Sequence, residues 1–141
     1  MLFRSRPQTW ETIERFKGFQ SLASDERFLN AEVILLDCLT IMMTNLMFDE
    51  PIDYDLTTQE VVNTVEQKIW QEVKELLEVV KANDKILFIV SNEVGMGLVP
   101  PYKLGNYFRD ISGRMNQRVA EIADEVTFVA VGLPLKLKGA Q

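Results

Sequence analysis

Polar residues follow two apolar runs of the sequence, and their side chains could carry chemistry. Asp37 follows the run 33–36, while Asn92 and Glu93 come just after the run that ends at Val90. A carboxylate at the end of a buried strand can hold Mg²⁺ beside nucleotide phosphates. An amide or carboxylate at the same edge can orient a substrate hydroxyl or a water. Helix or loop capping explains all three residues equally well, so this pattern leaves both interpretations open.

Three arginines form a second group of candidates. Arg109, Arg114 and Arg118 lie in a segment that favours a helix, where they could supply positive charge to a polyphosphate. Asp110, however, precedes Arg114 by four residues, and a solvated ion pair at that spacing contributes only about 0.3–0.5 kcal/mol. The sequence does not choose between these interpretations.

Missing residue types exclude several chemistries for these 141 residues. The sequence contains no histidine, which excludes a Ser-His-Asp triad, a Cys-His pair and a His-ligated zinc. It also contains no Gly-x-x-x-x-Gly-Lys-Ser/Thr pattern, whose backbone amides would surround phosphates. The segment 95–97, Gly-Met-Gly, lacks the lysine and the hydroxyl that would let it substitute.

Composition predicts a single globular domain over residues 1–141. Hydrophobic residues make up 47% and charged residues 26%, enough for a core of this size. The net charge of -6 argues against a nucleic-acid partner, because phosphate neutralisation needs an excess of clustered Lys and Arg. No apolar stretch approaches the roughly 20 residues of a membrane span, so we expect no membrane insertion. The single cysteine, Cys38, cannot form a disulfide within the chain, and we expect it to be a small buried hydrophobe. Because the sequence also starts without an apolar leader, we predict a cytoplasmic location.

The elements that must position the candidate residues follow from hydrophobic patterning. Continuous apolar runs predict strands buried on both faces, and Gly132-Leu133-Pro134 predicts a turn before a short last strand. The expected strands are 33–36, 85–90, 125–131 and 135–138.

Apolar residues spaced three or four apart predict the helices. A short helix is expected over 41–48, followed by a polar loop over 49–56. Thr57-Thr58-Gln59-Glu60 has the Thr-x-x-Glu form of a capping box, which predicts a long helix starting there and ending at Asn83. Another helix is expected over 102–123, where Gly105 and Gly113 would mark close packing or a nearby ligand. The apolar stripe of the long helix is expected to comprise Val61, Val65, Ile69, Val73, Leu76 and Val80.

Alternating strands and helices predict an α/β fold with a mostly parallel sheet and helices on both faces. Ligands of such folds bind at the carboxyl ends of the strands. Asp37, Asn92 and Glu93 are all expected at that edge.

Several longer segments carry a resemblance to a known family. They are Asp37-Cys38-Leu39-Thr40, Ser91-Asn92-Glu93-Val94-Gly95-Met96-Gly97 and the stretch 108–118. Two more segments flank them: before them stands Arg6-Pro7-x-x-Trp10-x-Thr12-x-Glu14, and after them Ala123-Asp124-Glu125-Val126. In their order and approximate spacing, from about Arg6 to Lys138, the chain resembles the bifunctional adenosylcobinamide kinase/adenosylcobinamide-phosphate guanylyltransferase family of cobalamin biosynthesis.

The resemblance implies an activity and an architecture. It implies a RecA-like P-loop core, assembled as a homotrimer, that uses ATP or GTP with Mg²⁺ to phosphorylate the aminopropanol hydroxyl of adenosylcobinamide. GMP from GTP is then transferred to that phosphate through a covalent intermediate on a histidine.

The resemblance also implies roles for individual residues. Phe3, Arg4, Ser5 and Arg6 correspond to nucleotide-contacting positions. Glu14 and Asp37 fall on acidic nucleotide or Mg²⁺ positions, with Asp37 the expected metal ligand. Asn92 is expected at the nucleotide, and Glu93 is the remaining candidate for a catalytic role.

The sequence also departs from the family pattern. Five residues precede Arg6, and Leu2 stands where the family's histidine is expected. The first strand, the P-loop and the nucleophile are therefore expected to be missing through truncation or an internal start, which predicts little native two-step activity. The alternative is a noncatalytic nucleotide-binding or assembly module on the same scaffold. A generic α/β nucleotide-binding protein is the third interpretation.

Overall fold

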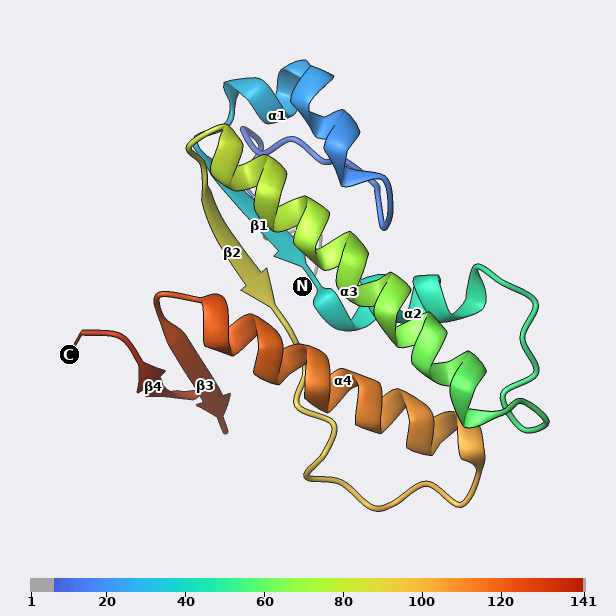
Figure 1. Cartoon of the computed structure of the whole chain (residues 1–141). Coiled ribbons are helices and arrows are strands. Elements are labelled where there is room, and N and C mark those ends of the chain that lie inside the picture. The colour runs from blue at the N-terminus through green and yellow to red at the C-terminus, as the bar shows by residue number, and fades with distance from the viewer. Residues whose placement is uncertain (1–6, 141) are drawn as a thin grey trace. The chain divides into compact units, whose positions relative to one another are not determined.

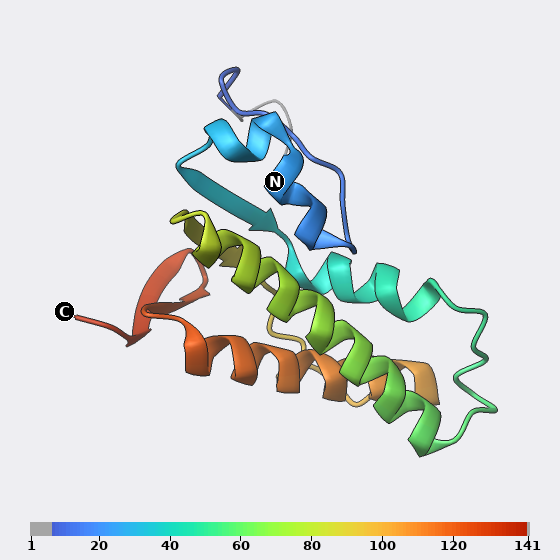
Figure 2. The same cartoon turned by 45° about the horizontal axis from the view of Figure 1, so that its top comes forward.

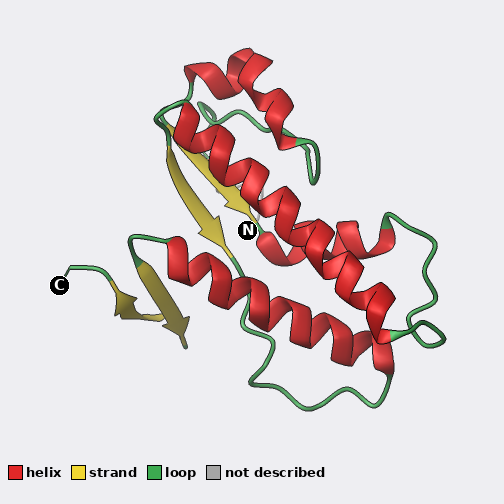
Figure 3. Cartoon of the chain, in the orientation of Figure 1, coloured by secondary structure: helices red, strands yellow, loops and turns green. Residues whose placement is uncertain are grey.

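The computed structural model describes residues 7–140, which form two compact units. Unit 1 contains residues 7–53 and 57–92, and unit 2 contains residues 54–56 and 93–140. Helices and strands occur in both (Figure 3). The prediction of one nucleotide-binding domain over 1–141 stays a prediction.

Unit 1 is an α/β unit built on two parallel strands. β1 pairs with β2 in continuous register, from Val33 opposite Ile86 to Asp37 opposite Val90. α3 lies over one face of this pair (Figures 1 and 2). Its elements are η2 (Phe19–Ser24), α1 (Glu26–Asn30), β1 (Val33–Asp37), α2 (Leu39–Phe48), α3 (Gln59–Ala82) and β2 (Ile86–Val90).

The two parallel strands are not buried on both faces, so that prediction was wrong. Along each strand, exposed residues alternate with partly buried ones. Successive side chains of a strand point to opposite faces, and one face of this pair is shielded while the other is exposed. The exposed apolar residues are Val33, Leu35, Ile86, Phe88 and Val90.

The core of unit 1 forms along α3, which contacts η2 and α2. Phe19 and Leu22 of η2 are buried, as are the three methionines of α2. The predicted stripe needs one correction, because Val61 is exposed and Val62 takes its place. The buried residues of this core include Met42, Met43, Met47, Val62, Val65, Ile69, Val73, Leu76, Val79 and Val80.

The start of α3 differs by one residue from the predicted capping box. Thr58, not Thr57, is the N-cap, and its hydroxyl accepts from the Val61 amide. The third helical position is therefore Val61, which cannot make the reciprocal bond of a capping box. Thr57 instead donates its amide to the Asp53 carbonyl, which ends the preceding loop.

Sequence patterning missed η2 and α1, which are too short to show helical periodicity. Asp25 caps α1 by accepting from the Arg27 amide, and its carboxylate also pairs with the Arg27 guanidinium at 2.7 Å. The side-chain hydrogen bond from Arg27 is the main reason that the pKa of Asp25 falls to about 2. This short helix is therefore held by its cap together with the buried side chain of Phe28.

Unit 2 contains α4 (Lys103–Ile122), β3 (Val126–Ala130) and β4 (Leu133–Lys138). β3 and β4 pair antiparallel, so parallel pairing does not extend to this hairpin. The turn consists of Val131 and Gly132, both at positive φ as a type I′ turn requires, and not of Gly132-Leu133-Pro134 as predicted. Pro134 fits within β4 because an edge strand tolerates a residue without an amide donor.

α4 lies within one residue of its predicted bounds, and it buries only a short stretch of its length. Ile111, Ser112 and Met115 are buried, whereas Ile122 is exposed. Gly113 has open space where a Cβ would point, so it does not mark close packing. No helix among residues 7–140 combines the length and apolar character needed to cross a membrane.

Truncating the centre of the α3 core should destabilise unit 1. Ile69 is fully buried, so Ile69→Ala should lower the free energy of unfolding by about 2–5 kcal/mol through lost burial and a residual cavity. Ile41→Ala makes the same change at an exposed helical position and should have a much smaller effect. Urea unfolding followed by far-ultraviolet circular dichroism measures both, and equal losses would contradict this description of the core.

Candidate functional site

The carboxyl edge of the β1–β2 pair brings together two predicted site residues. Asp37 is the last residue of β1 and lies opposite Val90, the last residue of β2. Asn92 follows two residues later. Because both strands run the same way, their polar ends meet at one edge, and the Asp37 side chain is exposed there.

A side chain that the sequence analysis gave no role joins this edge to α2. The Thr40 hydroxyl accepts from the Asn92 backbone amide at 3.0 Å and from the Asn92 side-chain amide at 3.3 Å. Thr40 lies in the first turn of α2 and is only 8% exposed. It therefore fixes the segment after β2 against the helix that follows Asp37.

Cys38 is the residue between Asp37 and α2, and it is not the buried hydrophobe predicted. It is the N-cap of α2, is partly exposed, and makes no side-chain capping bond. Since α2 begins directly after it, the positive end of the helix dipole lies next to the Asp37 edge.

Glu93 lies in unit 2, where its carboxylate closes a local turn. Its Oε1 accepts from the Gly95 amide at 2.6 Å. This is the loop-capping arrangement that the sequence analysis weighed against a role in catalysis. The catalytic role of Glu93 stays a prediction.

The three candidate arginines do not share one face of α4. Arg109 and Arg118 are nine positions apart, which places them on roughly opposite sides of an α-helix. Arg109 donates Nη2 to the Gly95 carbonyl at 2.7 Å and so anchors the loop that precedes the helix. The geometry of α4 therefore does not favour a shared phosphate clamp formed by all three.

The other predicted site residues lie near the start of the chain. Glu14 is exposed, in the irregular segment before η2. Phe3, Arg4, Ser5 and Arg6 lie outside the described residues. Within residues 7–140, no three Cys, Asp or Glu side chains converge on a metal-sized centre.

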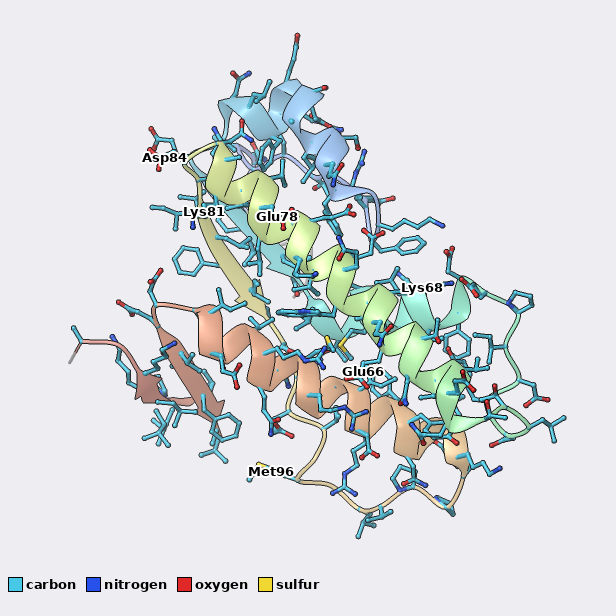
Figure 4. The ribbon with its side chains drawn as sticks, viewed as in Figure 1. Glu66, Lys68, Glu78, Lys81, Asp84 and Met96 are labelled. Carbon is cyan, nitrogen blue, oxygen red and sulfur yellow. The ribbon has the colours of Figure 1, made fainter. Side chains whose placement is uncertain are left out.

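A small pocket of about 190 Å³ lies in unit 1, away from the strand ends in sequence. Its charges are largely matched, because Lys17 pairs with Asp49 at 2.7 Å and Lys68 of α3, labelled in Figure 4, pairs with Glu50. Ligand pockets usually measure about 300–1,000 Å³, so this one is small for an organic substrate. It is lined by Lys17, Leu46, Asp49, Glu50, Val65, Lys68, Gln71 and Glu72.

Removing the Thr40 hydroxyl should loosen the segment after β2. In Thr40→Val the Asn92 amide loses this acceptor, and a typical hydrogen bond contributes about 0.5–1.5 kcal/mol. We expect faster hydrogen exchange at the Asn92 amide, measured by NMR. Thr40→Ser keeps the hydroxyl and should exchange nearly as slowly as the unaltered chain. Unchanged exchange in Thr40→Val would show that this hydrogen bond does not hold the segment.

Comparison with known proteins identifies the family. The model of the cobinamide kinase / cobinamide phosphate guanyltransferase family matches residues 3–137. A bifunctional adenosylcobalamin biosynthesis protein CobU of Escherichia coli K12 is 39% identical over 135 residues, covering 96% of this chain and 74% of the relative. The Salmonella typhimurium protein of the same name is 36% identical, covering 94% and 72%. The Pseudomonas aeruginosa protein CobP, also named as bifunctional in adenosylcobalamin biosynthesis, is 33% identical, covering 95% and 69%. The chain therefore belongs to the cobinamide kinase / cobinamide phosphate guanyltransferase family.

Proposed function

We propose that this chain belongs to cobalamin biosynthesis, in the phosphorylation of adenosylcobinamide and the transfer of GMP from GTP to the resulting phosphate, and that these 141 residues alone have little of this activity. The observation that carries this proposal is the family match, which runs through both units. In the first reaction, the hydroxyl oxygen of cobinamide attacks the γ-phosphorus of ATP or GTP, and the nucleoside diphosphate leaves. In the second, the cobinamide phosphate receives GMP from GTP, and pyrophosphate leaves.

Asp37 is the residue we propose for Mg²⁺. Mg²⁺ is commonly held by one or two carboxylates together with substrate phosphates and water, so a converging cage of protein ligands is not required. An exposed carboxylate at the carboxyl end of a parallel strand fits that donor set. When bound, Mg²⁺ would neutralise charge on the phosphates during transfer.

Asn92 and Thr40 are proposed to position the substrates at the same edge. Phosphoryl transfer depends mainly on alignment and charge stabilisation, so a fixed segment beside the phosphates is useful. The two hydrogen bonds to Thr40 hold Asn92 in one arrangement. In this proposal Glu14, Phe3, Arg4, Ser5 and Arg6 complete the nucleotide contacts.

The architecture we propose is a RecA-like P-loop NTPase core without the family's first strand and P-loop in these 141 residues, acting as a single nucleotide-binding domain and assembled as a homotrimer. Parallel pairing of β1 with β2 supports the core, and the sequence resemblance supports both the core and the assembly. The exposed apolar residues on one face of β1 and β2 are also compatible with coverage by further protein, because such residues are normally buried in parallel sheets.

The second candidate function is a noncatalytic nucleotide-binding or assembly module. It is favoured by one observation: these 141 residues contain neither a histidine nor the Gly-x-x-x-x-Gly-Lys-Ser/Thr pattern. We expect no protein-bound GMP after incubation of the chain with radiolabelled GTP and Mg²⁺, as judged by denaturing electrophoresis. Acid-labile label on the chain would mean that another side chain serves as the nucleophile, and the module would then be rejected.

The proposed Mg²⁺ role predicts how Asp37→Asn affects binding. Removing a group that hydrogen-bonds to a metal ligand lowers metal affinity about 10–100-fold. Removing the proposed ligand itself should therefore lower the Mg²⁺-dependent affinity for GTP at least about tenfold. Fluorescence anisotropy with a labelled GTP should show this loss in millimolar Mg²⁺ and little difference in EDTA.

Asp84→Asn is the matched control for that experiment. Asp84 lies in the turn between α3 and β2, before the strand rather than after it (Figure 4), and asparagine tolerates its positive φ. It should bind the labelled GTP like the unaltered chain. Equal Mg²⁺-dependent affinity in the Asp37 and Asp84 variants would remove Asp37 from the site.

A further inference from the structure

The loop between Glu93 and α4 exposes a cluster of apolar side chains. Met96 is 79% exposed, Leu98 is 97% exposed, and Val99 is 67% exposed. Met96 projects outward from the loop in Figure 4. We call residues 94–102 the apolar loop. Isolated exposed apolar residues are ordinary, but several together in one short segment typically mark a contact surface.

The C-terminal half of the apolar loop packs closely on the first turn of α4. A Cβ on Gly105 would lie 2.6 Å from Cβ of Pro100 and 2.8 Å from Cε2 of Tyr102. No real Cβ can approach that closely, so the loop depends on glycine at position 105. Asn106 adds hydrogen bonds from its side-chain amide to the Pro100 carbonyl at 3.0 Å and to the Tyr102 carbonyl at 3.1 Å.

The N-terminal half is held by charged side chains. Arg109 donates to the Gly95 carbonyl at 2.7 Å, and Glu93 accepts from the Gly95 amide at 2.6 Å. Both charged groups are engaged at the base of the loop, while Met96 and Leu98 lie beyond it. The loop therefore combines an anchored base with an apolar tip, which lowers the conformational entropy lost when a ligand orders it.

The composition of the tip limits what can bind there. Residues 94–102 include no Asp, Glu, Lys or Arg, so the loop offers no side-chain charge to a phosphate or a nucleic acid. Apolar side chains instead suit a broad ligand face with few charges. The tip is thus chemically unlike the Asp37 edge.

We propose that the apolar loop binds the corrin ring of cobinamide, with Met96, Leu98 and Val99 against the ring. This inference rests on the proposed function, which makes cobinamide a substrate. A corrin is a wide macrocycle with methyl groups and neutral amide arms, so it matches an uncharged apolar surface. It is also larger than the 190 Å³ pocket of unit 1 can enclose, which requires a more open surface.

The residues that hold the base of the apolar loop also have a function in this proposal. Gly105, Asn106 and Arg109 are positioning residues, since each holds the loop without belonging to its apolar tip. Arg109 thus serves the corrinoid surface rather than a polyphosphate. A second copy of the chain is the competing occupant of such an apolar surface, and the experiment must distinguish it.

Equilibrium dialysis of the full 141-residue chain with adenosylcobinamide tests the inference, because corrin absorbance reports binding without turnover. Leu98→Ser should weaken binding at least about tenfold, since most of this exposed side chain would be covered by the ring. Leu56→Ser makes the same change at a leucine that is 82% exposed outside the loop, and it should bind like the unaltered chain. Labelled GTP is measured in parallel and should bind all three chains equally.

The outcomes separate this inference from the proposed function. Equal cobinamide affinity in Leu98→Ser and the unaltered chain overturns the loop assignment, as does absence of cobinamide binding in a chain that still binds GTP. Loss of GTP binding alone overturns the nucleotide role and leaves the loop assignment standing. A changed molar mass of Leu98→Ser in light scattering, with cobinamide affinity retained, identifies a second copy as the occupant and rejects the corrin.

Discussion

The register of β1 against β2 is the constraint on which the candidate site depends. Asp37 lies opposite Val90, so the residue after β1 and the residues after β2 leave the sheet at the same level. A shift of one residue would turn alternate side chains to the other face and separate Asn92 from Thr40. The exposed apolar face of the strands does little to fix this register, whereas the backbone ladder and the Thr40 hydrogen bonds do. The site and the strand pair are therefore stabilised by the same alignment.

Local patterns in the sequence predicted most of the elements, because helical periodicity is a property of neighbouring residues. α3 and α4 lie within one or two residues of their expected bounds. The errors arose where the deciding interaction is not local or the local signals compete. Thr57 and Thr58 are both good caps, and only the backbone path chooses between them. Burial of the strands depends on what covers each face, which an apolar run cannot reveal.

The candidate site was predictable to the same extent. Strand ends could be located from the sequence, so Asp37 and Asn92 were expected at one edge. Thr40 was missed because its hydrogen bonds to Asn92 span 52 residues of sequence. Glu93 and Arg109 were candidates because of their charge, Glu93 at a predicted strand end and Arg109 in a predicted helix. The structure gives each a hydrogen bond to Gly95, which for Glu93 is the loop capping offered as an alternative and for Arg109 spans 14 residues of sequence.

Adjacent residues of this chain thus satisfy different physical demands. Asn92 is held by hydrogen bonds to a buried hydroxyl, and such a fixed segment suits the proposed alignment of phosphates. From Glu93 onward, polar groups fix only the base of a loop whose tip is apolar. The proposed substrate joins a phosphate acceptor to a large apolar ring, so under this proposal it needs both kinds of surface, and neither can replace the other. An apolar tip would not stabilise phosphate charge, and a charged edge would be costly to desolvate against a ring.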